Sequence, residues 1–243
     1  MATYHFQYAH PTFGTKKNPA PEENWRNTVY YYWWAFLRRH DGYRECCEQG
    51  GAGPFAGLYA DFGNAHTSTF KEWWNHPGRA KHLFAEPKSP HHFEILTEPP
   101  TREDLADPDV FYVKVPLNFP KRALQRYFAQ TLAAKKHTGE RGKQYARMSR
   151  ARYRVRGQPN LDALQKILAV YDRWREQPKP LWCIAVDLHL FHLDSDRPTP
   201  DEANAAAATT SRYLRKAKLI IENVGRGVFP YEEGKRKNDT SGT

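Results

Sequence analysis

The chain has 243 residues, of which 40% are hydrophobic and 14% aromatic, enough apolar material for one large or two modest domains. Its 37 lysines and arginines exceed its 27 acidic residues, and the net charge of +10 makes nucleic acid the first candidate partner. Three cysteines, two of them adjacent, exclude a disulfide framework, and the sequence has no leader-like start and no apolar run of about 18 residues, so we expect a soluble cytoplasmic protein.

The N-terminal third predicts an arm followed by an aromatic-rich helical unit. Residues 1–23 contain several prolines and predict an extended arm at a mobile end of the chain. Residues 24–86 predict helices, because apolar residues recur at helical spacing from Asn24. The run Tyr30-Tyr31-Tyr32-Trp33-Trp34 has few neighbouring cations, so we expect core packing rather than base stacking. Thr69 and Glu72 have the spacing of a capping box and predict a short helix.

In the middle of the chain, the spacing of the apolar residues changes from helical to alternating and back to helical. Residues 87–108 are rich in proline, histidine and acids and are expected to form a linker or irregular segment. Apolar and polar residues alternate over residues 111–117, which predicts a half-buried strand, and residues 118–135 predict a helix with an apolar face. We therefore expect an α+β, predominantly helical protein. Residues 109–230 would form its second unit, with a polar tail at residues 231–243.

The densest charge lies in residues 133–156, where nine basic residues accompany one acidic residue, Glu140. A solvated charged surface is the ordinary interpretation, but the one-sided segregation favours a loop that neutralises phosphates. Arginine suits forked phosphate contacts or insertion into a minor groove. The predicted contacts are Lys135, Lys136, Arg141, Lys143, Arg147, Arg150, Arg152, Arg154 and Arg156.

The C-terminal part predicts a bundle that resembles a helix-turn-helix. A helix is expected to begin at Asn160. In residues 181–188, the spacing Ile184-Ala185-x-x-Leu188 is common in the support helix of helix-turn-helix domains, where the small residue allows close approach. Residues 209–221 combine an apolar stripe with a basic face and would form the recognition helix. Its predicted contacts are Thr210, Ser211, Arg212, Arg215 and Lys216.

Two features oppose that interpretation. Eighteen residues, 191–208, separate the two helices, whereas an ordinary turn has three or four. The connection is therefore an insertion, or the pair is not a true helix-turn-helix. An ordinary surface helix with a solvated basic face is the other interpretation of residues 209–221.

A metal site is the enzymatic alternative. Residues 184–190 also alternate as a strand would, and a cluster then becomes possible at Asp187, His189, His192, Asp194 and Asp196. Such a cluster could hold a divalent ion, as in a nuclease. No acidic pair with a lysine at a recognised nuclease spacing accompanies it. We therefore expect no catalytic residue, no metal and no cofactor.

Several phrases resemble proteins of mobile elements. The phrase Trp34-Ala35-Phe36-Leu37-Arg38-Arg39-His40-Asp41-Gly42-Tyr43-Arg44 resembles the WxFLRRNxxYR opening of a poorly characterised domain in regulator-like proteins of plasmids and integrative elements. Residues 112–118, 168–172 and 211–230 contain phrases similar to uncharacterised proteins of phage-derived islands. The resemblance implies a mobile-element context and a regulatory role, but no activity and no catalytic residues.

The sequence therefore predicts a nucleic-acid-binding protein, most simply a double-stranded DNA-binding regulator or accessory protein of a mobile genetic element. The alternatives are an RNA-binding or single-strand-binding subunit of a larger nucleoprotein complex, a metal-dependent nuclease and a protein-interaction module. The expected partners are duplex DNA and a protein recruited by the N-terminal aromatic unit, with no membrane.

Overall fold

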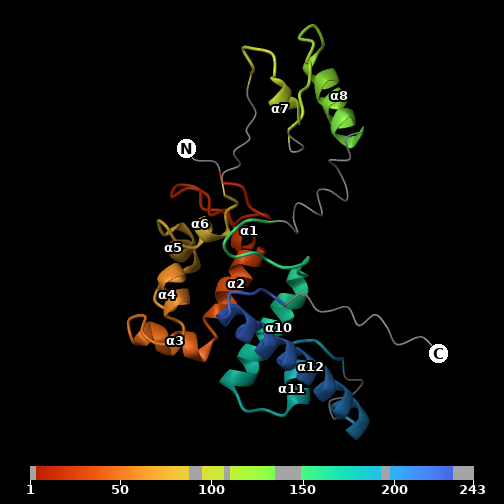
Figure 1. The fold of residues 1–243 in the computed structure, drawn as a ribbon. Helices are drawn as coiled ribbons and strands as arrows, with labels where there is room; N and C mark the ends of the chain where they lie inside the picture. The colour runs from red at the N-terminus through yellow and green to blue at the C-terminus, as the bar shows by residue number, and fades with distance from the viewer. Residues whose placement is uncertain (1–3, 88–94, 107–109, 135–148, 193–197, 232–243) are drawn as a thin grey trace, which may run out of the picture. The chain divides into compact units, whose positions relative to one another are not determined.

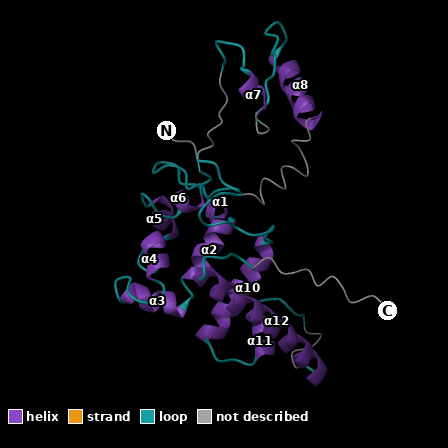
Figure 2. Cartoon of the chain, viewed as in Figure 1, coloured by secondary structure: helices purple, strands orange, loops and turns teal. Residues whose placement is uncertain are grey.

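The computed structural model describes residues 4–87, 95–106, 110–134, 149–192 and 198–231, and these are predominantly helical (Figure 1). Figure 2 shows helices joined by loops, and the described ranges contain isolated β-bridges but no strand. The chain divides into two units, one formed by residues 1–85 with 151–243 and the other by residues 86–150. The expected unit of residues 109–230 is thus divided at residue 150.

The N-terminal part of the first unit is organised around one buried helix. Its helices are α1 (Glu23–Arg26), α2 (Val29–Leu37), α3 (Asp41–Glu48), α4 (Ala56–Phe62), α5 (Phe70–Asn75) and α6 (Lys81–Phe84). Every residue of α2 except Tyr31 is buried, which confirms that the aromatic run packs in the core. The predicted capping box is also confirmed, since Thr69 and Glu72 cap α5 reciprocally.

Because these aromatic side chains are buried, a partner protein recruited by the N-terminal aromatic unit would contact other residues of that unit. Tyr30, Trp33 and Trp34 are each less than a tenth exposed, and they contact other rings of the first unit. Ring faces that already pack against one another offer little apolar area to a second protein. The aromatic run therefore stabilises the fold.

Residues 4–22 are mostly exposed but contact this core through a few aromatic side chains. The ring of Phe6 lies 5.6 Å from that of Trp74, and Phe13 stacks 6.2 Å from Trp25. The backbone N–H of Thr12 donates to the carbonyl of Asn24 at 3.3 Å. The aromatic side chains hold the segment in place because they find ring partners in the core.

Three further helices complete the first unit: α10 (Leu161–Glu176), α11 (Leu181–Asp187) and α12 (Pro200–Gly225). The predicted start at Asn160 is confirmed, because its side chain accepts a hydrogen bond from the N–H of Ala163 at 2.9 Å. The start of the last helix was placed too late. A capping box between Thr199 and Glu202, with Pro200 in the first turn, begins α12 well before residue 209.

One hydrophobic core joins the N-terminal and C-terminal helices of the first unit. The ring of Trp33 lies 5.0 Å from Phe84, 5.7 Å from Tyr153 and 5.4 Å from Phe229. Both α10 and α12 pack against α2. The aromatic N-terminal helices and the C-terminal bundle therefore form a single packed body, not two separate domains.

The second unit contains α7 (Arg102–Ala106) and α8 (Lys121–Ala134), in which no residue is buried. The helix predicted for residues 118–135 corresponds to α8, which begins after Pro120. The strand predicted for residues 111–117 does not form. Phe111, Val113 and Val115 are 37%, 40% and 50% exposed, and no strand of the described residues pairs with this segment, which a strand requires.

No described helix combines the length and the hydrophobicity that crossing a membrane requires.

Candidate nucleic-acid interface

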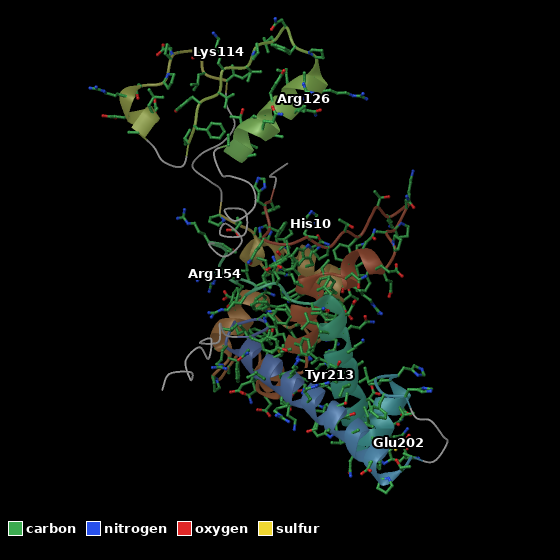
Figure 3. All side chains as sticks on the ribbon, turned by 90° about the vertical axis from the view of Figure 1, so that its right-hand side faces the viewer. His10, Lys114, Arg126, Arg154, Glu202 and Tyr213 are labelled. Carbon is green, nitrogen blue, oxygen red and sulfur yellow. The ribbon has the colours of Figure 1, made fainter. Side chains whose placement is uncertain are left out.

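The described part of the basic segment presents three arginines from the first unit. Arg152, Arg154 and Arg156 are exposed, whereas Ala151 and Val155 are buried and Tyr153 is half-buried. Exposure therefore alternates along the segment, with the charged groups toward solvent and the groups between them toward the core. Figure 3 labels Arg154 on the first unit.

Hydrogen bonds from three other parts of the first unit hold the backbone of this segment. Gln7 pairs with both backbone groups of Val155, donating to its carbonyl at 2.9 Å and accepting from its N–H at 3.2 Å. The N–H of Tyr153 donates to Leu83 at 3.1 Å, and that of Arg156 donates to Phe229 at 2.8 Å. The arginines therefore extend from a fixed backbone.

One carboxylate organises the start of the segment. The Oδ2 atom of Asp61, in α4, accepts a hydrogen bond from the hydroxyl of Tyr153 at 2.6 Å. The same oxygen forms an ion pair with the guanidinium of Arg152 at 2.7 Å. Burial, together with the hydrogen bond to Asp61, raises the pKa of Tyr153, so the hydroxyl stays protonated. The Arg152 side chain remains 64% exposed. Arg154 and Arg156 form no ion pair with a described residue, so their charges are open to an anionic ligand.

The other predicted basic residues of this segment lie in the second unit or outside the described residues. Arg150 is exposed but belongs to the second unit, where its N–H donates to the carboxylate of Glu86 at 2.8 Å. The remaining five lie outside the described residues: Lys135, Lys136, Arg141, Lys143 and Arg147.

Helix α12 exposes most of its predicted contacts but buries one. Arg212, Arg215 and Lys216 are exposed and Ser211 is half-buried. Thr210 is 0% exposed, and its hydroxyl donates to the carbonyl of Leu181 at 2.9 Å. Thr210 therefore joins α12 to the start of α11 and cannot reach a ligand. The apolar stripe predicted for this helix is confirmed, since Leu214, Ala217 and Ile221 are buried.

The close approach predicted for residues 181–188 is present. Residues 181–187 form the helix α11, so the alternative strand was wrong. Ile184 and Ala185 are fully buried, and α11 packs against α12. A small side chain at residue 185 permits that contact. The connection from Leu188 to Thr199 is still longer than an ordinary turn, so the pair departs from the usual helix-turn-helix.

The residues of the possible metal cluster are not assembled in the described part of the chain. Asp187 is the last residue of α11, and its Oδ2 forms an ion pair with the Nζ of Lys179 at 3.1 Å. Asp194 and Asp196 lie outside the described residues. Among the residues that the structure places, no three histidine, cysteine or acidic side chains are grouped as metal ligands.

The sequence interpretation missed a surface depression of about 520 Å³ in the first unit. It is lined by Asp41, Tyr171, Trp174, Arg175 and Lys218. The ammonium of Lys218 lies 4.5 Å from the centroid of the Trp174 ring, and Arg175 pairs with Asp41 at 2.7 Å. A signal was present in the sequence, because Trp174 stands among charged residues at the end of a helix. Its partners come from distant segments.

Neither a protein-family model, nor a curated protein, nor a solved structure matches this chain.

Proposed function

We propose that this protein binds nucleic acid, with duplex DNA as the principal ligand, as a regulator or accessory protein of a mobile genetic element. The observation that carries the proposal is the segment of residues 151–157, whose backbone is held by hydrogen bonds and whose three arginines are exposed. Arginine presents a planar fork of donors that matches phosphate oxygens. A segment fixed before binding loses little conformational freedom when it meets the ligand.

The spacing of the arginines supports contact with more than one phosphate. The three guanidinium groups come from alternate, exposed residues of one segment. Arg152, Arg154 and Arg156 can therefore reach separate phosphates along one backbone. Arg212, Arg215 and Lys216 add a second exposed basic group on α12, and helices present such groups to a DNA groove.

The test is a binding measurement over a range of salt concentrations. A fluorescent 20-base-pair duplex is titrated with the intact protein and with the triple variant Arg152→Gln/Arg154→Gln/Arg156→Gln. Each phosphate contact contributes about −0.9 to the slope of log affinity against log salt, so the triple variant should flatten that slope by up to about 3.

A matched control removes the same charge elsewhere. Lys16, Lys17 and Lys166 are exposed residues of the first unit that lie outside the proposed interface, and their combined replacement by glutamine should change the slope much less. No binding of DNA or RNA at low salt would overturn the proposal. Equal losses in the two triple variants would overturn the assignment of residues 152–156. Tighter binding of an RNA of the same length would instead favour the RNA-binding alternative.

A further inference from the structure

We propose that the depression lined by Trp174 and Lys218 binds one unpaired nucleotide of a nucleic-acid strand. The phosphate would contact Lys218 and Arg175, and the base would lie against Trp174. This inference rests on the proposed function for the kind of ligand, but it assigns a separate site and a separate preference.

Three helices build the depression. Asp41 is the first residue of α3, whereas Tyr171, Trp174 and Arg175 lie within the last two turns of α10. Lys218 comes from the middle of α12. The bidentate pair between Arg39 and Asp172, with both N–O distances at 2.5 Å, ties α10 to the chain just before α3. The walls of the depression are therefore parts of a packed bundle.

The charges around the depression favour an anion. Arg44 and Arg175 both contact the same oxygen of Asp41, Oδ1. Among the residues that line the depression, Arg175 and Lys218 accompany the single carboxylate of Asp41, so an excess of one positive charge remains. The hydrogen bond from Arg175 lowers the pKa of Asp41, so its carboxylate stays ionised and continues to hold the guanidinium. A phosphate that enters would meet cations already in position.

An exposed aromatic ring stands beside those cations. Trp174 is 36% exposed, and its ring lies 5.9 Å from that of Tyr171 at an interplanar angle of 47°. The cation–π contact places the Lys218 ammonium without neutralising its charge. Aromatic rings beside basic side chains bind the bases of single strands by stacking, with little sequence preference.

The size of the depression selects the form of the ligand. A volume of about 520 Å³ falls in the range of about 300–1,000 Å³ typical of pockets for small ligands. A base inside a duplex is stacked between its neighbours and cannot enter such a site. The unpaired end or gap of a strand can, so we expect a preference for duplexes that carry a single-stranded extension.

The experiment compares two probes at one salt concentration: a blunt 20-base-pair duplex and the same duplex with a five-nucleotide thymidine extension. The intact protein should bind the extended probe at least about fivefold more tightly, given the usual strength of base stacking on aromatic rings. Trp174→Leu and Lys218→Met should each remove that difference. Lys166→Met, an exposed lysine of α10 outside the depression, should retain it.

Competition distinguishes the possible sources of the phosphate. Thymidine monophosphate should displace the extension at lower concentration than inorganic phosphate, because only the nucleotide also contacts Trp174. Equal competition by both would overturn the role of the ring.

The two proposals fail differently. Equal affinity for blunt and extended probes would overturn this inference and leave duplex binding intact, whereas no binding of either probe would overturn both. Retention of the preference by folded Lys218→Met would also overturn the inference. That variant keeps the tryptophan, so it serves as the test if Trp174→Leu does not fold.

Discussion

The hydroxyl of Tyr153 donates a hydrogen bond to Oδ2 of Asp61 at 2.6 Å. The same oxygen receives Arg152, the neighbour of Tyr153, at 2.7 Å. One carboxylate of α4 thus binds two consecutive side chains of the arginine segment. It holds the tyrosine ring against the core and keeps the guanidinium at the surface, so the core and the candidate interface share this group.

Removal of the Tyr153 hydroxyl should destabilise the fold. Tyr153→Phe retains the ring but deprives Asp61 of one donor, and we expect a loss of about 1–2 kcal/mol in the free energy of unfolding. Urea denaturation followed by circular dichroism measures it. Tyr213→Phe is the matched control, since Tyr213 is half-buried on α12 and should change stability little. Equal losses in both variants would contradict the role given to the Asp61 bond.

Neutralisation of Asp61 should strengthen binding to duplex DNA. The carboxylate competes with phosphate for Arg152, and because the Arg152 side chain is 64% exposed although that of Asp61 is only 11% exposed, we take about 1 kcal/mol for this ion pair. Asp61→Asn should therefore raise affinity by up to about fivefold at low salt. Fluorescence anisotropy well below the unfolding temperature measures it, with Asp201→Asn, an exposed acidic residue of α12 away from this segment, as the control. Weaker binding by Asp61→Asn would mean that the carboxylate positions Arg152 for its ligand.

A side chain at residue 225 should clash with His40. A Cβ on Gly225 would lie 2.3 Å from His40 Nε2, so Gly225→Ala should cost about 1–3 kcal/mol despite the better helix propensity of alanine. Gly57→Ala is the matched control, because a Cβ there meets nothing within 4 Å and α4 should be stabilised. Thermal unfolding of the two variants should shift in opposite directions, and a shift in the same direction would contradict the close approach.

Acidification should destabilise the protein in part through His40. Its Nδ1 accepts a hydrogen bond from the N–H of Tyr43 at 3.1 Å and caps α3, and burial lowers its pKa below 6.5. The unfolded chain takes up the proton near pH 6.5, whereas the folded chain resists it. The stabilisation is therefore complete above pH 6.5 and is lost as the pH falls through the folded pKa.

The measurement compares the free energy of unfolding at pH 7.5 and pH 5.5. Asparagine can also cap a helix but does not titrate, so His40→Asn should lose less stability on acidification than the intact protein. His66, whose pKa burial also lowers, should account for part of the remaining difference, which His66→Gln tests. An unchanged difference in His40→Asn would contradict the contribution of His40.

Local signals predicted helix starts well because capping joins residues only three positions apart. Asn160 and Thr69 cap their helices as expected. The same rule also shows why the start of α12 was placed too late, since Thr199 and Glu202 form an equally good capping box earlier in the chain. The alternation in residues 111–117 did not suffice for a strand, because a strand also needs a partner.

The sequence by itself determined the predominantly helical character, the aromatic core helix and the concentration of arginines in residues 150–156. These properties depend on residue type and on spacing within one segment. Only the tertiary structure decided that Gln7, Leu83 and Phe229 hold the arginine segment, that Thr210 is buried and that Lys218 lies over Trp174. Each of these contacts joins residues far apart in the chain, so no local pattern encodes them.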